Sequence, residues 1–191
     1  MGLWSVWGIK KMKIKVEKSI FLEIPDIFIS RIDCTPENIV KLLDTLEFKN
    51  NIEVIADMGF ENEKNFPIEK IEKFKIKHNS SFEKSKYSNG WFRLIASPKE
   101  CINFLNDIFE FDIEAIFILD LRDEGIWKQS PHYTNMELSK ELIKQNVMNS
   151  YLTAFIDEYE IVITFNKDTY DAKKLVAKIK ALFLRRNKLR S

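Results

Sequence analysis

Three aspartates stand where predicted strands end, and carboxylates in such positions could do chemistry. Asp33, Asp57 and Asp120 each close or follow an apolar run that is typical of a strand. Open α/β sheets bind ligands beyond the carboxyl ends of their strands, and carboxylate oxygens suit Mg²⁺. If the three aspartates meet, they could hold Mg²⁺ for phosphoester chemistry. The simpler interpretation is that Asp is common at strand ends because its side chain binds nearby backbone amides.

The polar connection at residues 122–135 is a second candidate region. It holds His132, so on the enzyme interpretation the active site includes this connection. On the competing interpretation it binds a protein partner, because acidic side chains steer a basic partner and aromatic side chains anchor it. The partner-binding residues expected are Asp123, Glu124, Trp127 and Tyr133, with Trp91 beside an earlier polar loop.

Other acidic residues gather at the ends of predicted elements. Besides Asp120, Asp123 and Glu124, they are Asp107, Glu110, Asp112 and Glu114, and then Asp157, Glu158 and Glu160. These clusters could form a patch complementary to a basic protein surface. The alternative is that they are scattered surface acids, which are ordinary in a chain with 31% charged residues.

Several chemistries lack the residues they need. The two histidines, His78 and His132, are far apart, and Cys34 and Cys101 form no CxxC pattern, so zinc and copper sites are not expected. The five glycines form no P-loop, GxGxxG turn or GxSxG elbow. No cofactor is therefore expected. Without a disulfide framework, a targeting segment or an apolar run long enough to span a membrane, the chain is predicted to be soluble and cytoplasmic.

The C-terminal segment could contact phosphates. Its basic residues are Lys173, Lys174, Lys178, Lys180, Arg185, Arg186, Lys188 and Arg190. A solvated helix face with cations near the helix C-terminus is the favoured interpretation, because the net charge of only +1 gives no strong field toward nucleic acid. Nucleic-acid binding therefore ranks last.

A strand, a capping residue and an amphipathic helix recur about three times, and these units would position the candidate residues. The first runs from Ile27 through Thr35-Pro36-Glu37, the second from Trp91 through a Ser97–Glu100 capping box, and the third from Tyr159 into the C-terminal helix. Strands follow the first two helices at once, so each is predicted to be a βαβ unit with parallel pairing.

The predicted fold is therefore a single α/β domain over residues 12–191, with residues 1–11 as a loose extension. Its mixed sheet has the apolar segment Glu114–Leu121 at the centre, an antiparallel hairpin at Asp157-Glu158 and a long C-terminal helix. Alternation at Ile68–Lys77 predicts an edge strand, and a helix is expected from Met136 to about Met148.

The function that these observations favour is a cofactor-free cytosolic protein-interaction module. Bacterial immunity and antitoxin-type inhibitors are small domains of this kind, and the Lys-, Ile- and Asn-rich composition is typical of an AT-rich bacterial or phage gene. The expected partner is a protein, for example a toxin, with no membrane or metal involved. The alternative is the Mg²⁺-dependent phosphoester enzyme, and convergence of Asp33, Asp57 and Asp120 in one pocket would favour it.

Overall fold

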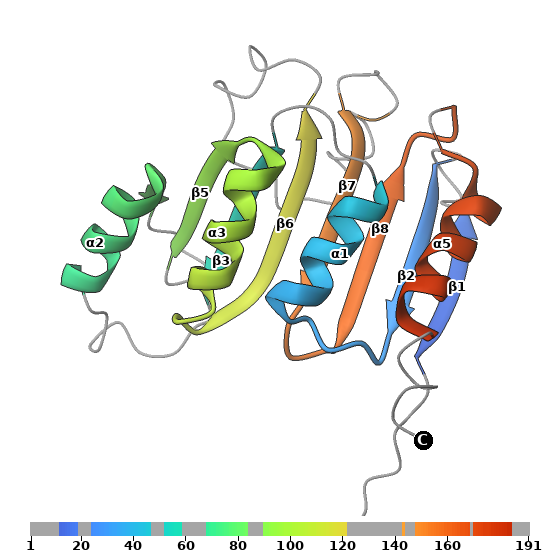
Figure 1. The fold of residues 1–191 in the computed structure, drawn as a ribbon, viewed down its shortest axis with the longest axis horizontal. Helices are drawn as coiled ribbons and strands as arrows, with labels where there is room; N and C mark the ends of the chain where they lie inside the picture. The colour runs from blue at the N-terminus through green and yellow to red at the C-terminus, as the bar shows by residue number, and fades with distance from the viewer. Residues whose placement is uncertain are drawn as a thin grey trace, which may run out of the picture.

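In the part of the chain that the structure describes, eight strands form one sheet and four helices lie on one of its faces (Figure 1). This computed structural model describes residues 12–18, 24–46, 52–58, 68–83, 90–121, 143, 148–168 and 170–184. The strands are β1 Lys13–Lys18, β2 Pro25–Ser30, β3 Ile52–Met58, β4 Ser81–Glu83, β5 Gly90–Ala96, β6 Ile113–Leu121, β7 Met148–Phe155 and β8 Glu160–Phe165. The helices are α1 Pro36–Leu46, α2 Ile68–His78, α3 Pro98–Ile108 and α5 Ala172–Leu184.

The strand order is β1-β2-β8-β7-β6-β3-β5-β4, and every neighbouring pair is antiparallel. The predicted mixed sheet built from parallel βαβ units is therefore wrong. β5 and β6 run in the same direction with α3 between them in the chain, but β3 lies between them in the sheet. Likewise β8, β7 and β6 separate β2 from β3, which α1 connects. A local strand-helix-strand pattern can set the direction of two strands without making them neighbours.

Two further predictions concern individual elements. The predicted edge strand at Ile68–Lys77 is wrong, because this segment is the helix α2, which buries Ile71 and Phe74 three residues apart. The predicted helix at 136–148 lies mostly outside the described residues, and its last residue, Met148, begins β7. The predicted extension at residues 1–11 also lies outside them.

Local signals at helix starts and at the C-terminal hairpin are confirmed. Before α3, the Glu100 amide donates to Ser97 Oγ over 3.4 Å, and the Ser97 amide donates to the Glu100 carboxylate over 2.9 Å, which completes a capping box. Thr35 Oγ1 accepts from the Asn38 amide at the start of α1. β7 and β8 form an antiparallel hairpin around Asp157 and Glu158.

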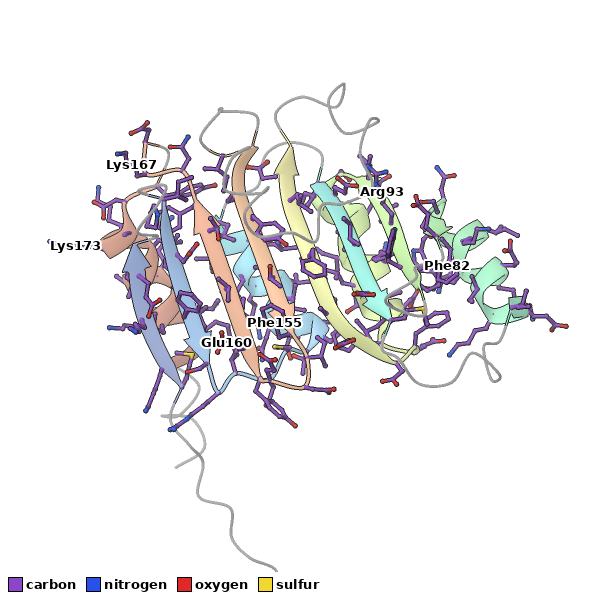
Figure 2. The ribbon with its side chains drawn as sticks, turned by 180° about the vertical axis from the view of Figure 1, so that it is seen from behind. Phe82, Arg93, Phe155, Glu160, Lys167 and Lys173 are labelled. Atoms are coloured by element: carbon purple, nitrogen blue, oxygen red, sulfur yellow. The ribbon has the colours of Figure 1, made fainter. Side chains whose placement is uncertain are left out.

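Each face of the sheet carries its own apolar cluster. The helix-covered face packs residues such as Ile27, Val54 and Leu152 against α1, α3 and α5. The second face, seen from behind in Figure 2, carries a smaller cluster: Ile24, Ile55, Ala115, Phe117, Leu119, Ile143 and Tyr151. Since Ile143 is buried there, the chain between β6 and β7 contacts the second face at that residue. Of the described helices, none combines the length and apolar character needed to cross a membrane.

Candidate functional site

The structure does not bring Asp33, Asp57 and Asp120 together. Asp120 pairs with the first residue of β3 and Asp57 lies near its last, so they are roughly 17 Å apart along the strand. Asp33 follows β2, which is four strand spacings, roughly 19 Å, from β3. Among the described residues, no group of three or more His, Cys, Asp or Glu side chains could hold a metal ion. His132 lies outside the described residues.

Most of the predicted partner-binding residues also lie outside the described part of the chain. These are Asp123, Glu124, Trp127 and Tyr133. The remaining one, Trp91 in β5, is half-buried and packs against the apolar cluster of the second face, with Asp57 opposite it on β3. Trp91 therefore supports the sheet as well as facing outward.

The fold brings other acidic residues from the predicted clusters together where several strands begin or end, along one margin of the sheet. We call Asp33, Asp112, Glu114, Asp157, Glu158 and Glu160 the acidic edge. Backbone hydrogen bonds join the segments that carry them: the Ile156 amide donates to the Glu114 carbonyl (3.0 Å), and the Ile32 amide donates to the Tyr159 carbonyl (3.1 Å). Figure 2 shows Phe155 and Glu160 close together at the end of the β7–β8 hairpin.

Among the residues that the structure describes, the carboxylates of the acidic edge face solvent and form no ion pair. Five of them are exposed and Glu160 is half-buried, and within the described chain none of the six is in an ion pair. The neighbouring acids Asp107 and Glu110 behave differently, because Lys77 and Lys70 of α2 pair with them. The predicted acidic clusters thus divide into a group beside α2 that is paired with lysines and a group at the edge that forms no ion pair in the described chain.

Tyr159 projects from the middle of the acidic edge. It closes the turn after Glu158, where its amide donates to the Ile156 carbonyl over 3.3 Å, and its side chain is 56% exposed. Its φ of 55° is left-handed, a conformation that costs a residue with a Cβ about 1–2 kcal/mol. Glycine would fit this turn without that cost. The sequence pattern places Tyr159 at the start of a strand and so misses this feature; the absence of glycine from so tight a hairpin is the signal that could have shown it.

A buried thiol supports the turn from within the sheet. Cys34 Sγ contacts the carbonyl oxygens of Phe155 (3.4 Å), Glu160 (3.6 Å) and Ile32 (3.7 Å). Burial, with the negative charge of Asp33, raises the pKa of the Cys34 thiol to about 12. The thiol therefore stays protonated and unreactive, and it acts as a donor that ties β2 to the hairpin.

The second face also contains a buried ion pair that the sequence does not announce. Glu53 is fully buried, its Oε1 accepts from Arg93 Nε, and its Oε2 has no hydrogen-bond partner in the described structure. Burial raises the pKa of Glu53, and Arg93 opposes part of that rise. Across the same face, Thr164 donates to Asp26 over 2.6 Å. Both pairs join strands that are distant in the chain, so no local pattern could indicate them.

Comparison with known proteins adds no family to these observations. No protein-family model matches the chain, and no curated protein or solved structure is significantly similar to it.

Proposed function

We propose that this chain is a cofactor-free protein-interaction module that works in the cytoplasm and binds a basic protein through the acidic edge. The observation that carries the proposal is the exposed Tyr159 in a left-handed conformation, flanked by carboxylates that form no ion pair within the described chain. An inhibitor of the immunity or antitoxin type, with a basic toxin as its partner, is the form of this proposal that size and composition favour.

Charge and ring have separate roles in such an interface. Clustered carboxylates attract a basic partner over a distance of about 10 Å at ordinary ionic strength, and this raises the association rate. Tyrosine is enriched among residues that dominate binding energy, because its ring buries a large area with little loss of conformational freedom. Unpaired like charges around Tyr159 destabilise the free protein, and a basic partner would relieve that repulsion.

The buried thiols and the bonding of the β7–β8 hairpin support the cytoplasmic location and the preorganised interface in this proposal. Cys34 and Cys101 are buried and free, as is usual in a reducing compartment. The hairpin that presents Tyr159 is held by backbone bonds to β2 and β6 and by Cys34, so the edge is preorganised. The three aspartates that the Mg²⁺ alternative requires are dispersed over the sheet, which disfavours that alternative.

Differential capture from a host lysate tests the proposal. Wild type is compared with Asp157→Lys/Glu158→Lys, with Tyr159→Ala, and with the control Asp44→Lys/Glu69→Lys, which reverses two exposed acids on helices away from the edge. A protein with a basic surface that is retained by wild type and the control, but lost with both edge variants, is expected. Equal capture by all four proteins would refute the assignment of the acidic edge.

A further inference from the structure

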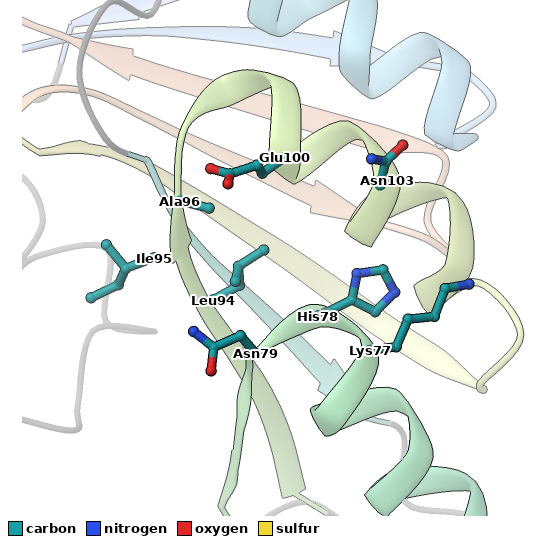
Figure 3. A pocket seen from close by; sticks show the side chains of 8 residues that line it. All are labelled: Lys77, His78, Asn79, Leu94, Ile95, Ala96, Glu100 and Asn103. Atoms are coloured by element: carbon teal, nitrogen blue, oxygen red, sulfur yellow. The ribbon is translucent and has the colours of Figure 1, made fainter.

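A cavity of about 300 Å³ lies between the C-terminal end of α2, the first turns of α3 and strand β5 (Figure 3). It is separate from the acidic edge and from the aspartates at strand ends. Its walls combine apolar side chains of β5, including Leu94, with polar side chains of the two helices, including His78, Asn79 and Asn103. Its volume is at the lower limit for small-molecule sites.

His78 is held rigidly at this cavity. Its side chain is only 7% exposed, and its ring lies against Phe74 (centroids 4.5 Å apart) and Phe104 (5.6 Å). Its Nε2 donates to Asp107 Oδ2 over 2.8 Å. The pKa of Asp107 is lowered by hydrogen bonds from Lys77 and His78, so the acceptor is a carboxylate.

The bond to Asp107 determines what His78 offers the cavity. In the neutral imidazole it keeps the proton on Nε2 and leaves Nδ1 as a hydrogen-bond acceptor. Figure 3 shows the ring nitrogen remote from Lys77 directed into the cavity, toward Glu100 and Asn103. Within the described residues, this nitrogen has no hydrogen-bond partner. A side chain more than nine-tenths buried thus presents one unused acceptor to an open space.

The two asparagines add unused groups of both kinds. The side-chain amides of Asn79 and Asn103 form no hydrogen bond within the described chain. Each can donate through its nitrogen and accept through its oxygen. Together with His78 Nδ1, they give the cavity acceptors and donors for a ligand that carries an N–H and a carbonyl or a ring nitrogen.

The charged side chains that line the cavity, Lys77 and Glu100, already have hydrogen-bonding partners. The Lys77 ammonium pairs with Asp107 over 2.5 Å. The Glu100 carboxylate accepts from the Ser97 amide (2.9 Å) and the Ser97 hydroxyl (2.6 Å). Among the described residues at the cavity, an anionic ligand would therefore find no free cation, and a cationic ligand would have to compete with the cap of α3.

We propose that this cavity binds a small neutral molecule with an amide-like edge, such as a nucleobase. In this complex His78 Nδ1 accepts a hydrogen bond from a ligand N–H, and the Asn103 amide pairs with another donor or acceptor of the ligand. Leu94 contacts an apolar face of the ligand. Asp107 is a positioning residue, because it orients the imidazole without reaching the ligand.

Nitrogen NMR of the full-length protein tests the site. Uracil, adenine and nicotinamide are the neutral probes, at millimolar concentrations, and benzoate and benzylamine are the charged comparators. His132 is the only other histidine, so it serves as the internal reference. At least one neutral probe is expected to shift the His78 Nδ1 and Asn103 side-chain signals in a saturable way, while His132 and the comparators show no such response.

Matched variants distinguish this site from general surface binding. Asn103→Ala and His78→Phe, which keeps an aromatic ring against Phe74 and Phe104, are each expected to weaken probe binding by about tenfold or more. Asn106→Ala removes an exposed amide from the same helix outside the cavity and should bind as wild type does. The proposal is overturned if no neutral probe saturates, if a charged comparator binds as tightly, or if Asn103→Ala and His78→Phe bind like wild type.

Discussion

Tyr159 shows how a single residue can combine a backbone cost with an exposed side chain. Its left-handed φ of 55° would suit glycine, yet the position carries a ring that is 56% exposed. Strained positions of this kind cluster at functional sites. The turn itself would favour glycine, so the presence of tyrosine at this position is explained by its side chain. That side chain would act in the proposed interface.

Glycine and alanine at position 159 separate the backbone from the ring. Both variants remove the ring, but only glycine removes the left-handed penalty, so Tyr159→Gly should exceed Tyr159→Ala in free energy of unfolding by about 1 kcal/mol. Urea denaturation measures the difference. Partner capture should fall equally in both variants. A glycine variant no more stable than the alanine variant would contradict the left-handed conformation of this turn.

The buried thiols predict a loss of stability at alkaline pH. Burial raises the pKa of Cys34 and Cys101 to about 12, from 9.0 for an unhindered thiol. Between these two pKa values the native state binds more protons than the unfolded state. The contribution of the protonated thiols to the free energy of unfolding is therefore fully present below about pH 9 and declines toward pH 12. The free energy of unfolding should fall by about 1 kcal/mol per thiol on going from neutral pH to about pH 10. In Cys34→Ala/Cys101→Ala this part of the pH dependence should vanish; an unchanged slope would show that other groups cause it.

At the scale of elements, the Glu53–Arg93 pair links β3 to β5 on the second face. Removing Arg93 leaves the Glu53 carboxylate buried without its cation, so Arg93→Ala should destabilise by about 3 kcal/mol. Replacing both residues, as in Glu53→Met/Arg93→Leu, should recover most of that loss, because no buried charge remains. Chemical denaturation of the three proteins checks this. A double variant less stable than Arg93→Ala would mean that the pair itself, rather than the orphaned carboxylate, dominates.

The contribution of the Ser97 cap to the stability of α3 can be tested by substitution. Ser97→Ala removes the acceptor for the Glu100 amide, so it should cost about 1 kcal/mol. Ser97→Asn, which can still cap, is the control and should lose much less. An unchanged denaturation midpoint in Ser97→Ala would show that the cap contributes nothing to the stability of α3.

Elements were predictable where their causes are local. The Ser97–Glu100 spacing predicts the cap of α3, and the apolar run Glu114–Leu121 predicts an interior strand, now β6 between β3 and β7. At α2, the alternation of Phe74, Lys75, Ile76 and Lys77 favours a strand, but the buried Ile71 and Phe74 follow the helical spacing. The helical conformation of this segment depends on burial against the rest of the fold. A short stretch of sequence carries no information about that burial.

At the scale of the whole molecule, strand neighbours could not be predicted. The insertion of β3 between β5 and β6, and of β8, β7 and β6 between β2 and β3, depends on contacts between distant segments. The same holds for the candidate sites. The sequence identifies the acids of Asp112–Glu114 and Asp157–Glu160, but only the antiparallel register brings them to one edge. It gives no sign of the His78–Asp107 bond, which joins α2 to α3.

Both faces of the sheet should contribute to global stability. Leu105 is fully buried on the helix-covered side, and Phe117 is 6% exposed on the second face. Leu105→Ala and Phe117→Ala should each lower the free energy of unfolding by about 2–5 kcal/mol, because each leaves a cavity in packed apolar surroundings. Calorimetry or urea denaturation measures both. A small effect at Phe117 alone would mean that the second face is not a structural core.

The proposed function depends most directly on whether the acidic edge steers a basic partner. The decisive measurement is the association rate of the captured partner with wild type and with Asp157→Lys/Glu158→Lys over a range of salt concentrations. The wild-type rate should fall steeply with salt, and charge reversal should slow association by about tenfold at low salt and flatten this dependence. The control Asp44→Lys/Glu69→Lys should keep the wild-type salt profile. Identical rates and salt dependence for wild type and the edge variant would contradict the proposed interface.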